Sequence, residues 1–258
     1  MSWFLASVRS ADEADVALAG GADIIDAKEP AMGALGAVAP ATLRDIAARV
    51  AGRLPVSATI GDLELQPDAV RAAVETTAGD GADIVKIGLF AGDLDGTLAA
   101  LRPVTGRGVR IVAVLFGDRA PALADLSRRC AEAGFFGVMI DTADKSAGPL
   151  SAHLDMPALA AFVAGARDLG LVSGLAGSLR LADIAQLASL GADYLGFRSA
   201  LTAGGRHGDI DLGAVRAVRQ ALDRSDARSS ATATAGAMSA AMAPRAGVAT
   251  ATAVSKLR

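Results

Sequence analysis

Three lysines of this chain, Lys28, Lys86 and Lys145, stand at or close after the ends of predicted β-strands. The chain has 25 basic residues, of which only four are lysines and 21 are arginines. A buried lysine can lose its proton and form a Schiff base with a carbonyl carbon, whereas an arginine keeps its charge. Lysines retained at these positions therefore indicate carbonyl chemistry on a small substrate. The fourth, Lys256, lies near the C-terminus and receives no role.

A repeated pattern organises the residues around these lysines. GGADIIDAK (20–28), DGADIVKIG (80–88) and LGADYLGFR (190–198) share a Gly-Ala-Asp start and an apolar run, and AGFFGVMID (133–141) is a degenerate fourth copy. Each copy follows an alanine-rich helical stretch, so the glycine ends a helix and the next residues enter a strand. Four further apolar runs alternate with these copies, at residues 3–8, 54–60, 109–116 and 171–177.

These eight strands, each followed by room for a helix, predict a (β/α)8 barrel. Near-continuous apolar runs are typical of parallel strands that are covered on both faces. The main alternative, an open doubly wound sheet, would more naturally show a glycine-rich turn after its first strand, and this sequence has none there. We expect one barrel domain over residues 1–223. The Ala/Ser/Thr-rich remainder, residues 224–258, has no amphipathic period and is predicted to be a disordered tail.

The repeat also predicts which side chains meet. Positions five and seven after its glycine have the same parity, so both side chains point to one face of the strand. In the four copies these positions hold Asp26 and Lys28, Lys86 and Gly88, Met139 and Asp141, and Gly196 and Arg198. All four copies are even-numbered strands, and alternate strands of a barrel share a layer. We therefore expect Asp26, Lys28, Lys86, Asp141 and Arg198 to converge at the C-terminal mouth, within reach of Lys145.

Such a cluster has a direct chemical use. A lysine beside another cation in a partly dry pocket loses its proton more readily, and neighbouring aspartates can carry protons. The alternative is a buried ion-pair network that only holds the barrel closed. Networks of that kind usually pair charges one for one, so three lysines with two aspartates favour a catalytic site.

Small residues after the last two strands predict a phosphate site, which is common there in this fold. The candidates are Gly177, Ser178, Gly196, Arg198, Ser199, Gly204, Gly205 and Arg206. Ser57 and Thr59, at the end of the third strand, are candidates for hydrogen bonds to a substrate hydroxyl.

Composition excludes other classes of function. The net charge of −3 gives no electrostatic case for nucleic acid binding. No apolar run is long enough to cross a membrane, and the N-terminus lacks the features of a signal peptide. Cys130 is expected to be a buried thiol in a reducing compartment, and His153 and His207 lack metal-ligand spacing. We predict a cytoplasmic homo-oligomer that needs neither metal nor cofactor.

Together these motifs resemble the (5-formylfuran-3-yl)methyl phosphate synthase family of methanofuran biosynthesis. The resemblance runs from about residue 4 to residue 222. It rests on AGGADIIDAKEP (19–30), GALGA (33–37), VSATIGD (56–62), GADIVKIGL (81–89), MIDTADK (139–145), LAGS (175–178) and the Gly-Gly-Arg segment at 204–206. The fourth repeat departs from the pattern with Phe135 and Phe136, and the tail has no counterpart.

The resemblance implies a lyase that condenses two molecules of glyceraldehyde 3-phosphate to a furan carboxaldehyde phosphate, with loss of one phosphate and two waters. It also implies that Lys28 forms the Schiff base and that Lys86 is the general acid/base. Asp26, Asp141 and Lys145 would be supporting proton carriers.

Two alternatives remain open from the sequence. Asp26-Ala27-Lys28 matches the opening of the Asp-x-Lys decarboxylases and aldolases that act on phosphorylated sugars without a Schiff base, but their further aspartate would fall at Ala31. The other alternative is a non-catalytic phosphosugar-binding barrel. The lysines count against it, because the abundant arginines would suffice to bind phosphate.

Overall fold

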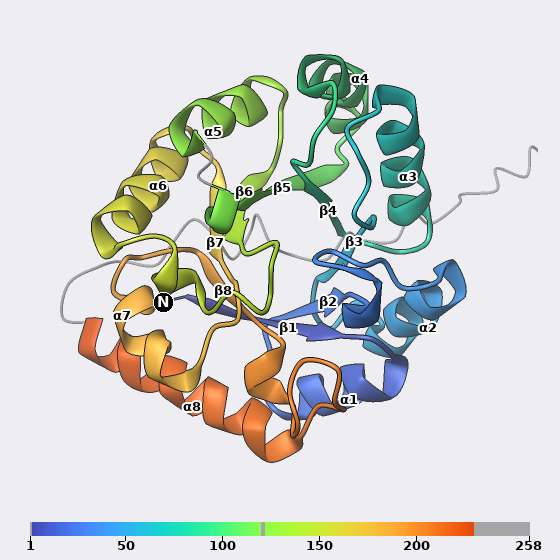
Figure 1. Ribbon diagram of the computed structural model, residues 1–258. Coiled ribbons are helices and arrows are strands. Elements are labelled where there is room, and N and C mark those ends of the chain that lie inside the picture. Colours follow the sequence, from blue (N-terminus) through green and yellow to red (C-terminus); the bar gives the residue numbers. More distant parts are fainter. Residues whose placement is uncertain (1, 120–121, 230–258) are drawn as a thin grey trace, which may run out of the picture.

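Eight parallel strands close into a barrel in the computed structural model of the chain, which describes residues 2–119 and 122–229 (Figure 1). Neighbouring strands pair in sequence order, and β8 closes the barrel against β1. The strands are β1 (Trp3–Val8), β2 (Ile24–Ala27), β3 (Val56–Thr59), β4 (Ile84–Gly88), β5 (Arg110–Phe116), β6 (Gly137–Asp141), β7 (Val172–Leu175) and β8 (Tyr194–Phe197). The predicted (β/α)8 fold is confirmed.

Helices follow the strands and form the outer ring (Figure 1). They are α1 (Ala11–Ala19), α2 (Pro40–Val50), α3 (Pro67–Gly79), α4 (Leu94–Gly106), α5 (Leu123–Glu132), α6 (Met156–Asp168), α7 (Ile184–Ala188) and α8 (Leu212–Ser229). Short 3₁₀ turns are η1 (Pro30–Met32), η2 (Gly117–Arg119), η3 (Leu150–Ala152), η4 (Leu181–Asp183) and η5 (Ser199–Leu201). Within the described part of the chain, none of the helices combines the length and apolarity that crossing a membrane requires.

Helix α8 extends past the predicted end of the barrel domain. The sequence placed that end at residue 223, but the helix continues to Ser229. The buried residues Val215, Val218, Leu222 and Ser225 form one stripe at helical spacing, and this stripe carries the helix past the predicted boundary. Residues 224–229 of the predicted tail are therefore helical, and residues 230–258 lie outside the described residues.

The sequence repeat has a structural cause. Its four glycines, Gly21, Gly81, Gly134 and Gly191, all have positive φ, which lets the chain turn from helix to strand. In three copies the aspartate two residues further on accepts a backbone N–H that starts the adjacent odd-numbered strand. These bonds join Asp23 to Phe4 at 2.8 Å, Asp83 to Val56 at 2.9 Å and Asp193 to Ser173 at 2.7 Å. The repeat thus aligns the strands at the end of the barrel opposite the predicted site.

Two apolar clusters hold the barrel together. The larger lies between the strands and the helices, and the smaller fills the barrel interior with residues such as Leu5, Ile84, Val114 and Tyr194. Gly174 on β7 makes room for Tyr194, because a Cβ at position 174 would lie 2.3 Å from Cζ of that ring. The interior is therefore packed below the C-terminal mouth, and the polar groups gather above it.

Candidate active site

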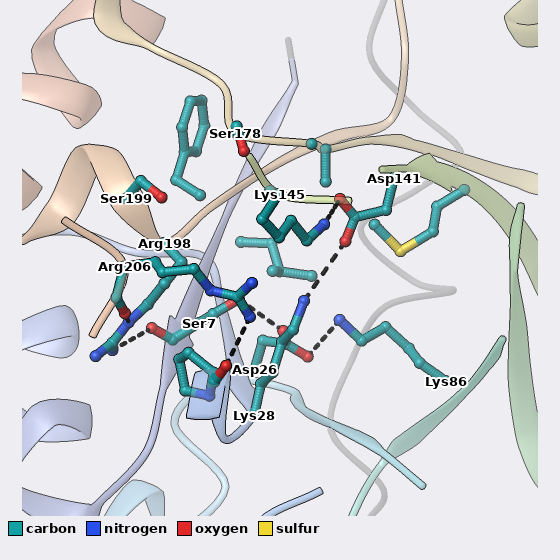
Figure 2. A pocket seen from close by; sticks show the side chains of 17 residues that line it. Ser7, Asp26, Lys28, Lys86, Asp141, Lys145, Ser178, Arg198, Ser199 and Arg206 are labelled. Carbon is teal, nitrogen blue, oxygen red and sulfur yellow. Dashed lines mark hydrogen bonds and ion pairs between the residues drawn. The ribbon is translucent and has the colours of Figure 1, made fainter. Parts of the chain in front are cut away.

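The charged residues of the even strands occupy two successive layers inside the mouth of the barrel (Figure 2). In the deeper layer, Lys86 Nζ of β4 lies 2.6 Å from Asp26 Oδ1 of β2. In the outer layer, Lys28 Nζ lies 3.5 Å from Asp141 Oδ2 at the end of β6. All four side chains are buried. The register of the repeat thus brings together four of the five charged residues that its spacing grouped, and the fifth, Arg198, lines the same cleft.

Asp26 is the most enclosed carboxylate of the cluster, with no exposed surface. Besides Lys86 it accepts hydrogen bonds from Ser7 Oγ at 2.8 Å and Ser57 Oγ at 2.6 Å. The hydroxyl of Ser57, a candidate for binding substrate, is therefore used to hold Asp26. Ser7 was missed by the sequence reasoning, although its parity with the inward-facing Leu5 on β1 would have placed it in the mouth.

Asp141 receives two ammonium groups. Lys145, from the loop between β6 and η3, is hydrogen-bonded to Oδ1, while Lys28 approaches Oδ2 (Figure 2). The backbone N–H of Thr142 also donates to Oδ1 at 2.8 Å. Burial alone would raise the pKa of Asp141, but the ammonium groups of Lys145 and Lys28 outweigh burial and hold that pKa well below its ordinary value. The carboxylate therefore stays ionised.

Two of the lysines have lowered pKa values. Burial lowers the pKa of Lys86, and the charge of Lys28 acts in the same direction against the opposing effect of Asp26. Burial lowers the pKa of Lys145 to about 8, with Asp141 opposing and the charges of Lys28 and Arg206 assisting. An ammonium group with a pKa near 8 can exchange its proton close to neutral pH, as acid–base catalysis requires.

The cleft above these pairs has a polar rim. It is lined by Gly177 and Ser178 after β7, by Gly196, Arg198 and Ser199 around the end of β8, and by Arg206. Gly177 and Ser178 both have positive φ, which is uncommon for a serine. A second, more open pocket lies alongside and shares Lys145, Ser178 and Ser199 with the cleft. Six of the eight predicted phosphate-site residues, Arg206 among them, thus lie around one opening.

The two arginines at this opening are engaged by the protein itself. Arg198 pairs with the buried Glu13 of α1 at 2.5 Å and donates to the carbonyl oxygens of Ser7, Arg206 and Gly208. Arg206 donates to the carbonyl oxygens of Pro30 and Gly33, each at 2.9 Å. Both guanidinium groups therefore fasten the loop after β8 across the mouth, to α1 and to the loop after β2.

The other predicted residues lie away from the cleft lining. Thr59 is buried and its hydroxyl donates to the carbonyl oxygen of Gly36 at 3.0 Å. Gly204 and Gly205 form an exposed turn with positive φ, next to the bridge between Thr202 and Ile210. The geometry therefore gives Thr59 a contact with the loop after β2, and gives the two glycines a place in the turn that carries Arg206.

A family model described as 4-HFC-P synthase matches residues 4–219, which run from β1 into α8. The chain belongs to this family. It is 36% identical over 232 residues to the (5-formylfuran-3-yl)methyl phosphate synthase of Methanothermobacter thermautotrophicus, covering 85% of this chain and 98% of that protein. A Methylorubrum extorquens protein that carries the same name as a provisional assignment is 48% identical over 197 residues, covering 76% of this chain and 81% of that protein.

Solved structures resemble this family member in fold alone. A 3-hexulose-6-phosphate synthase superimposes with a TM-score of 0.60 at 19% identity, covering 85% of this chain and 99% of that one. The thiamine phosphate pyrophosphorylase of Pyrococcus furiosus gives a TM-score of 0.60 at 12% identity, covering 87% and 96%.

Other candidate groups in this family member lie outside the mouth. Cys130 is buried in α5, as predicted, and burial raises the pKa of its thiol to about 12, so it is not a reactive thiolate. Among residues 2–119 and 122–229, no three His, Cys, Asp or Glu side chains gather as a metal site would require. The chemistry of the described residues is therefore concentrated in the lysine–aspartate cluster.

Proposed function

We propose that this chain is a (5-formylfuran-3-yl)methyl phosphate synthase that condenses two molecules of glyceraldehyde 3-phosphate. The observation that carries the proposal is the arrangement of three lysines around two buried aspartates in a member of this family. A network with a purely structural role would be expected to balance its charges, whereas this cluster has one more cation than anion. The excess positive charge suits a phosphorylated substrate.

The overall reaction needs no oxidant or reductant. Two triose phosphates contain the atoms of one furan aldehyde phosphate, one phosphate ion and two water molecules. Every step is therefore an addition, an elimination or a proton transfer. Lysines and carboxylates perform all three kinds of step.

Lys28 is the candidate for the covalent step. Its Nζ attacks the carbonyl carbon of one triose phosphate, a C–N bond forms, and the carbonyl oxygen leaves as water to give an iminium ion. The outer position of Lys28 favours it over Lys86, whose ammonium group is held at 2.6 Å by Asp26 at the deeper level. Lys145, which lies beside Lys28, carries the protons that this dehydration requires, while the ionised Asp141 holds the two ammonium groups next to each other.

Lys86 and Asp26 are then placed to move protons at the carbon next to the iminium ion. Loss of a proton there gives an enamine, the nucleophile for joining two trioses. The enamine electrons also expel a phosphate or a hydroxyl from a neighbouring carbon. Ser7 and Ser57 hold Asp26 in place for these transfers.

Two phosphorylated substrates need two places to bind. We assign one phosphate to the turn at Gly177 and Ser178, facing Ser199, where small residues allow a close approach of backbone N–H groups. The open pocket on the other side of Lys145 offers room for the second triose, because Lys145, Ser178 and Ser199 line both spaces. A cytoplasmic location, where triose phosphates are available, belongs to the same proposal. Homo-oligomer formation stays a prediction.

The proposal is tested by incubating the purified protein with glyceraldehyde 3-phosphate alone and analysing the products by mass spectrometry and phosphate assay. A furan aldehyde monophosphate formed together with one equivalent of phosphate is the expected result. Borohydride added during turnover should attach a reduced triose to Lys28. Unchanged substrate would refute the proposed reaction. Turnover with no adduct on any lysine would refute the Schiff-base route.

A further inference from the structure

Asp118, in the turn η2 that follows β5, binds the loop that carries Lys145. Its Oδ1 accepts the backbone N–H of Ala143 and its Oδ2 accepts that of Asp144, both at 2.8 Å. Lys145 is the next residue. A single carboxylate thus spans two successive N–H groups immediately before the catalytic candidate, in a contact between neighbouring connections of the barrel.

The loop is otherwise irregular. Between Asp141 and η3 it has no helix or strand, and Asp144 forms a local turn by accepting the backbone N–H and the hydroxyl of Ser146. Its far end is tied to the next connection, where the Leu150 N–H donates to the Gly177 carbonyl oxygen at 2.9 Å. The bonds to Asp118 involve the two residues directly before Lys145, whereas the bond at Leu150 lies further along the chain.

We infer that Asp118 is a positioning residue for Lys145: it holds the loop so that the ammonium group of Lys145 stays against Asp141. The inference rests on the proposed function only in giving Lys145 a catalytic task. Asp118 is not part of the cleft lining. It acts on Lys145 through the backbone N–H groups of Ala143 and Asp144, the two residues before that lysine.

The ionised carboxylate matters for this role. Burial raises the pKa of Asp118, but the N–H groups of Ala143 and Asp144, with a smaller contribution from His153, outweigh burial and lower that pKa. An asparagine in its place has one acceptor oxygen, so one N–H group would face an amide NH₂ and lose its bond. Asp118→Asn therefore removes one of the two hydrogen bonds to the loop, with almost no change in the shape of the side chain.

The small number of lysines makes a direct test possible. The four lysines of the full chain can be acetylated in a short pulse at a series of pH values, and each is then quantified by peptide mass spectrometry. In the wild type, the groups facing Lys145 are Asp141, Lys28 and Arg206, and its labelling midpoint should lie near pH 8. In Asp118→Asn the released loop lets water reach Lys145, so its midpoint should rise toward the ordinary lysine value. Lys86, held on β4, should keep its midpoint.

Asp93→Ala is the matched control. Asp93 also accepts a backbone N–H, that of Gly96 at 2.8 Å at the start of α4, but it does not bind the loop of Lys145. It should lose similar stability without moving the Lys145 midpoint. An unchanged midpoint in folded Asp118→Asn, or an equal shift in Asp93→Ala, would overturn the inference.

Kinetics gives a second, independent readout. Asp118→Asn should lower kcat roughly 10- to 100-fold with little change in KM, since a small misplacement of a catalytic group has effects of this size. In a Lys145→Met background the same substitution should change kcat very little, because the residue that it positions is absent. Full additivity of the two effects would contradict the positioning role.

The two proposals fail in different ways. If the protein does not convert glyceraldehyde 3-phosphate, the function is wrong, yet the labelling midpoint still decides whether Asp118 positions Lys145. Should Asp118→Asn not fold, as judged by circular dichroism, Asp118→Glu takes its place. Its carboxylate, displaced by one methylene, should shift the Lys145 midpoint in the same direction, and an unchanged midpoint would again count against the role.

Discussion

Two of the three clustered lysines belong to the barrel wall, and one belongs to a loop. Lys86 lies within β4, and Lys28 directly follows β2, where its backbone N–H donates to the Val8 carbonyl oxygen at 2.9 Å. Lys145 lies four residues after the end of β6, on a segment that is neither helix nor strand. The wall therefore sets where Lys28 and Lys86 lie, whereas Lys145 depends on contacts from neighbouring connections.

This difference suggests a division of labour. Strand residues keep fixed distances, which suits a nucleophile and a proton-transfer pair that must meet one reacting carbon. A loop residue can adjust as intermediates of different shape form, and its pKa of about 8 lets it change protonation near neutral pH. Four substitutions test the comparison between wall and loop.

Replacing Lys28 by arginine should have the largest effect. Lys28→Arg keeps the positive charge beside Asp141 but removes the amine that can form an imine, so kcat should fall at least about 1,000-fold, as for other covalent nucleophiles. The measurement is furan product formation, together with the borohydride adduct on the protein. The fold, monitored by circular dichroism, should be unchanged.

Lys256→Arg is the matched control, because it makes the same exchange at a lysine outside the described residues. It should keep full activity. Substantial turnover by Lys28→Arg would assign the covalent step to another wall lysine.

Removing the charge of Asp26 should affect both stability and rate. Asp26→Asn leaves the buried ammonium group of Lys86 without its counterion, which typically costs about 3–5 kcal/mol in free energy of unfolding. The rate should fall by about 10²- to 10⁴-fold through loss of the proton-transfer pair. Chemical denaturation and steady-state kinetics measure the two effects.

The double variant Asp26→Asn/Lys86→Met should regain much of the stability but none of the activity, because it removes the unpaired charge. Asp45→Asn, on the exposed face of α2, is the control for loss of an aspartate. Equal stability losses in Asp26→Asn and Asp45→Asn would show that the buried pair contributes little.

The positions of the barrel-wall residues could be predicted from the sequence. The distance of each residue from the repeat glycine sets which face of the strand its side chain points to and how deep in the barrel it lies. Asp26, Lys86 and Asp141 could be grouped without a structure, since each side chain follows from its distance to a repeat glycine. The loop contacts could not be grouped in this way. Glu13 lies on a helix 185 positions from its partner Arg198, and Asp118 binds backbone rather than a recognisable side chain. Contacts of this kind depend on how connections pack at the rim, which periodicity does not describe.

Substituting the loop lysine should change the pH dependence more than it changes the fold. Lys145→Met should lower kcat about 100-fold, within the range for loss of an acid–base group. In the wild type, neutral Lys145 is lost as pH falls through about 8, so kcat/KM should decrease on that side if it acts as a base. This limb should be missing in Lys145→Met. A wild-type limb that persists unchanged in the variant would belong to another group.

The smallest effect is expected from Ser57, a residue of the barrel wall whose hydroxyl donates a hydrogen bond to Asp26. Ser57→Ala removes one of two hydroxyl donors to Asp26, while Ser7 and Lys86 remain bonded to it. A hydrogen bond to a charged group contributes about 1.5–3 kcal/mol, so the free energy of unfolding should decrease by an amount within or below that range. Activity should fall by less than about tenfold, with KM for the triose phosphate nearly unchanged, because the hydroxyl faces Asp26. A large rise in KM with unchanged stability would instead mean that Ser57 binds the substrate hydroxyl, as the sequence alone suggested. Ser57 would then give up its hydrogen bond to Asp26 when substrate binds.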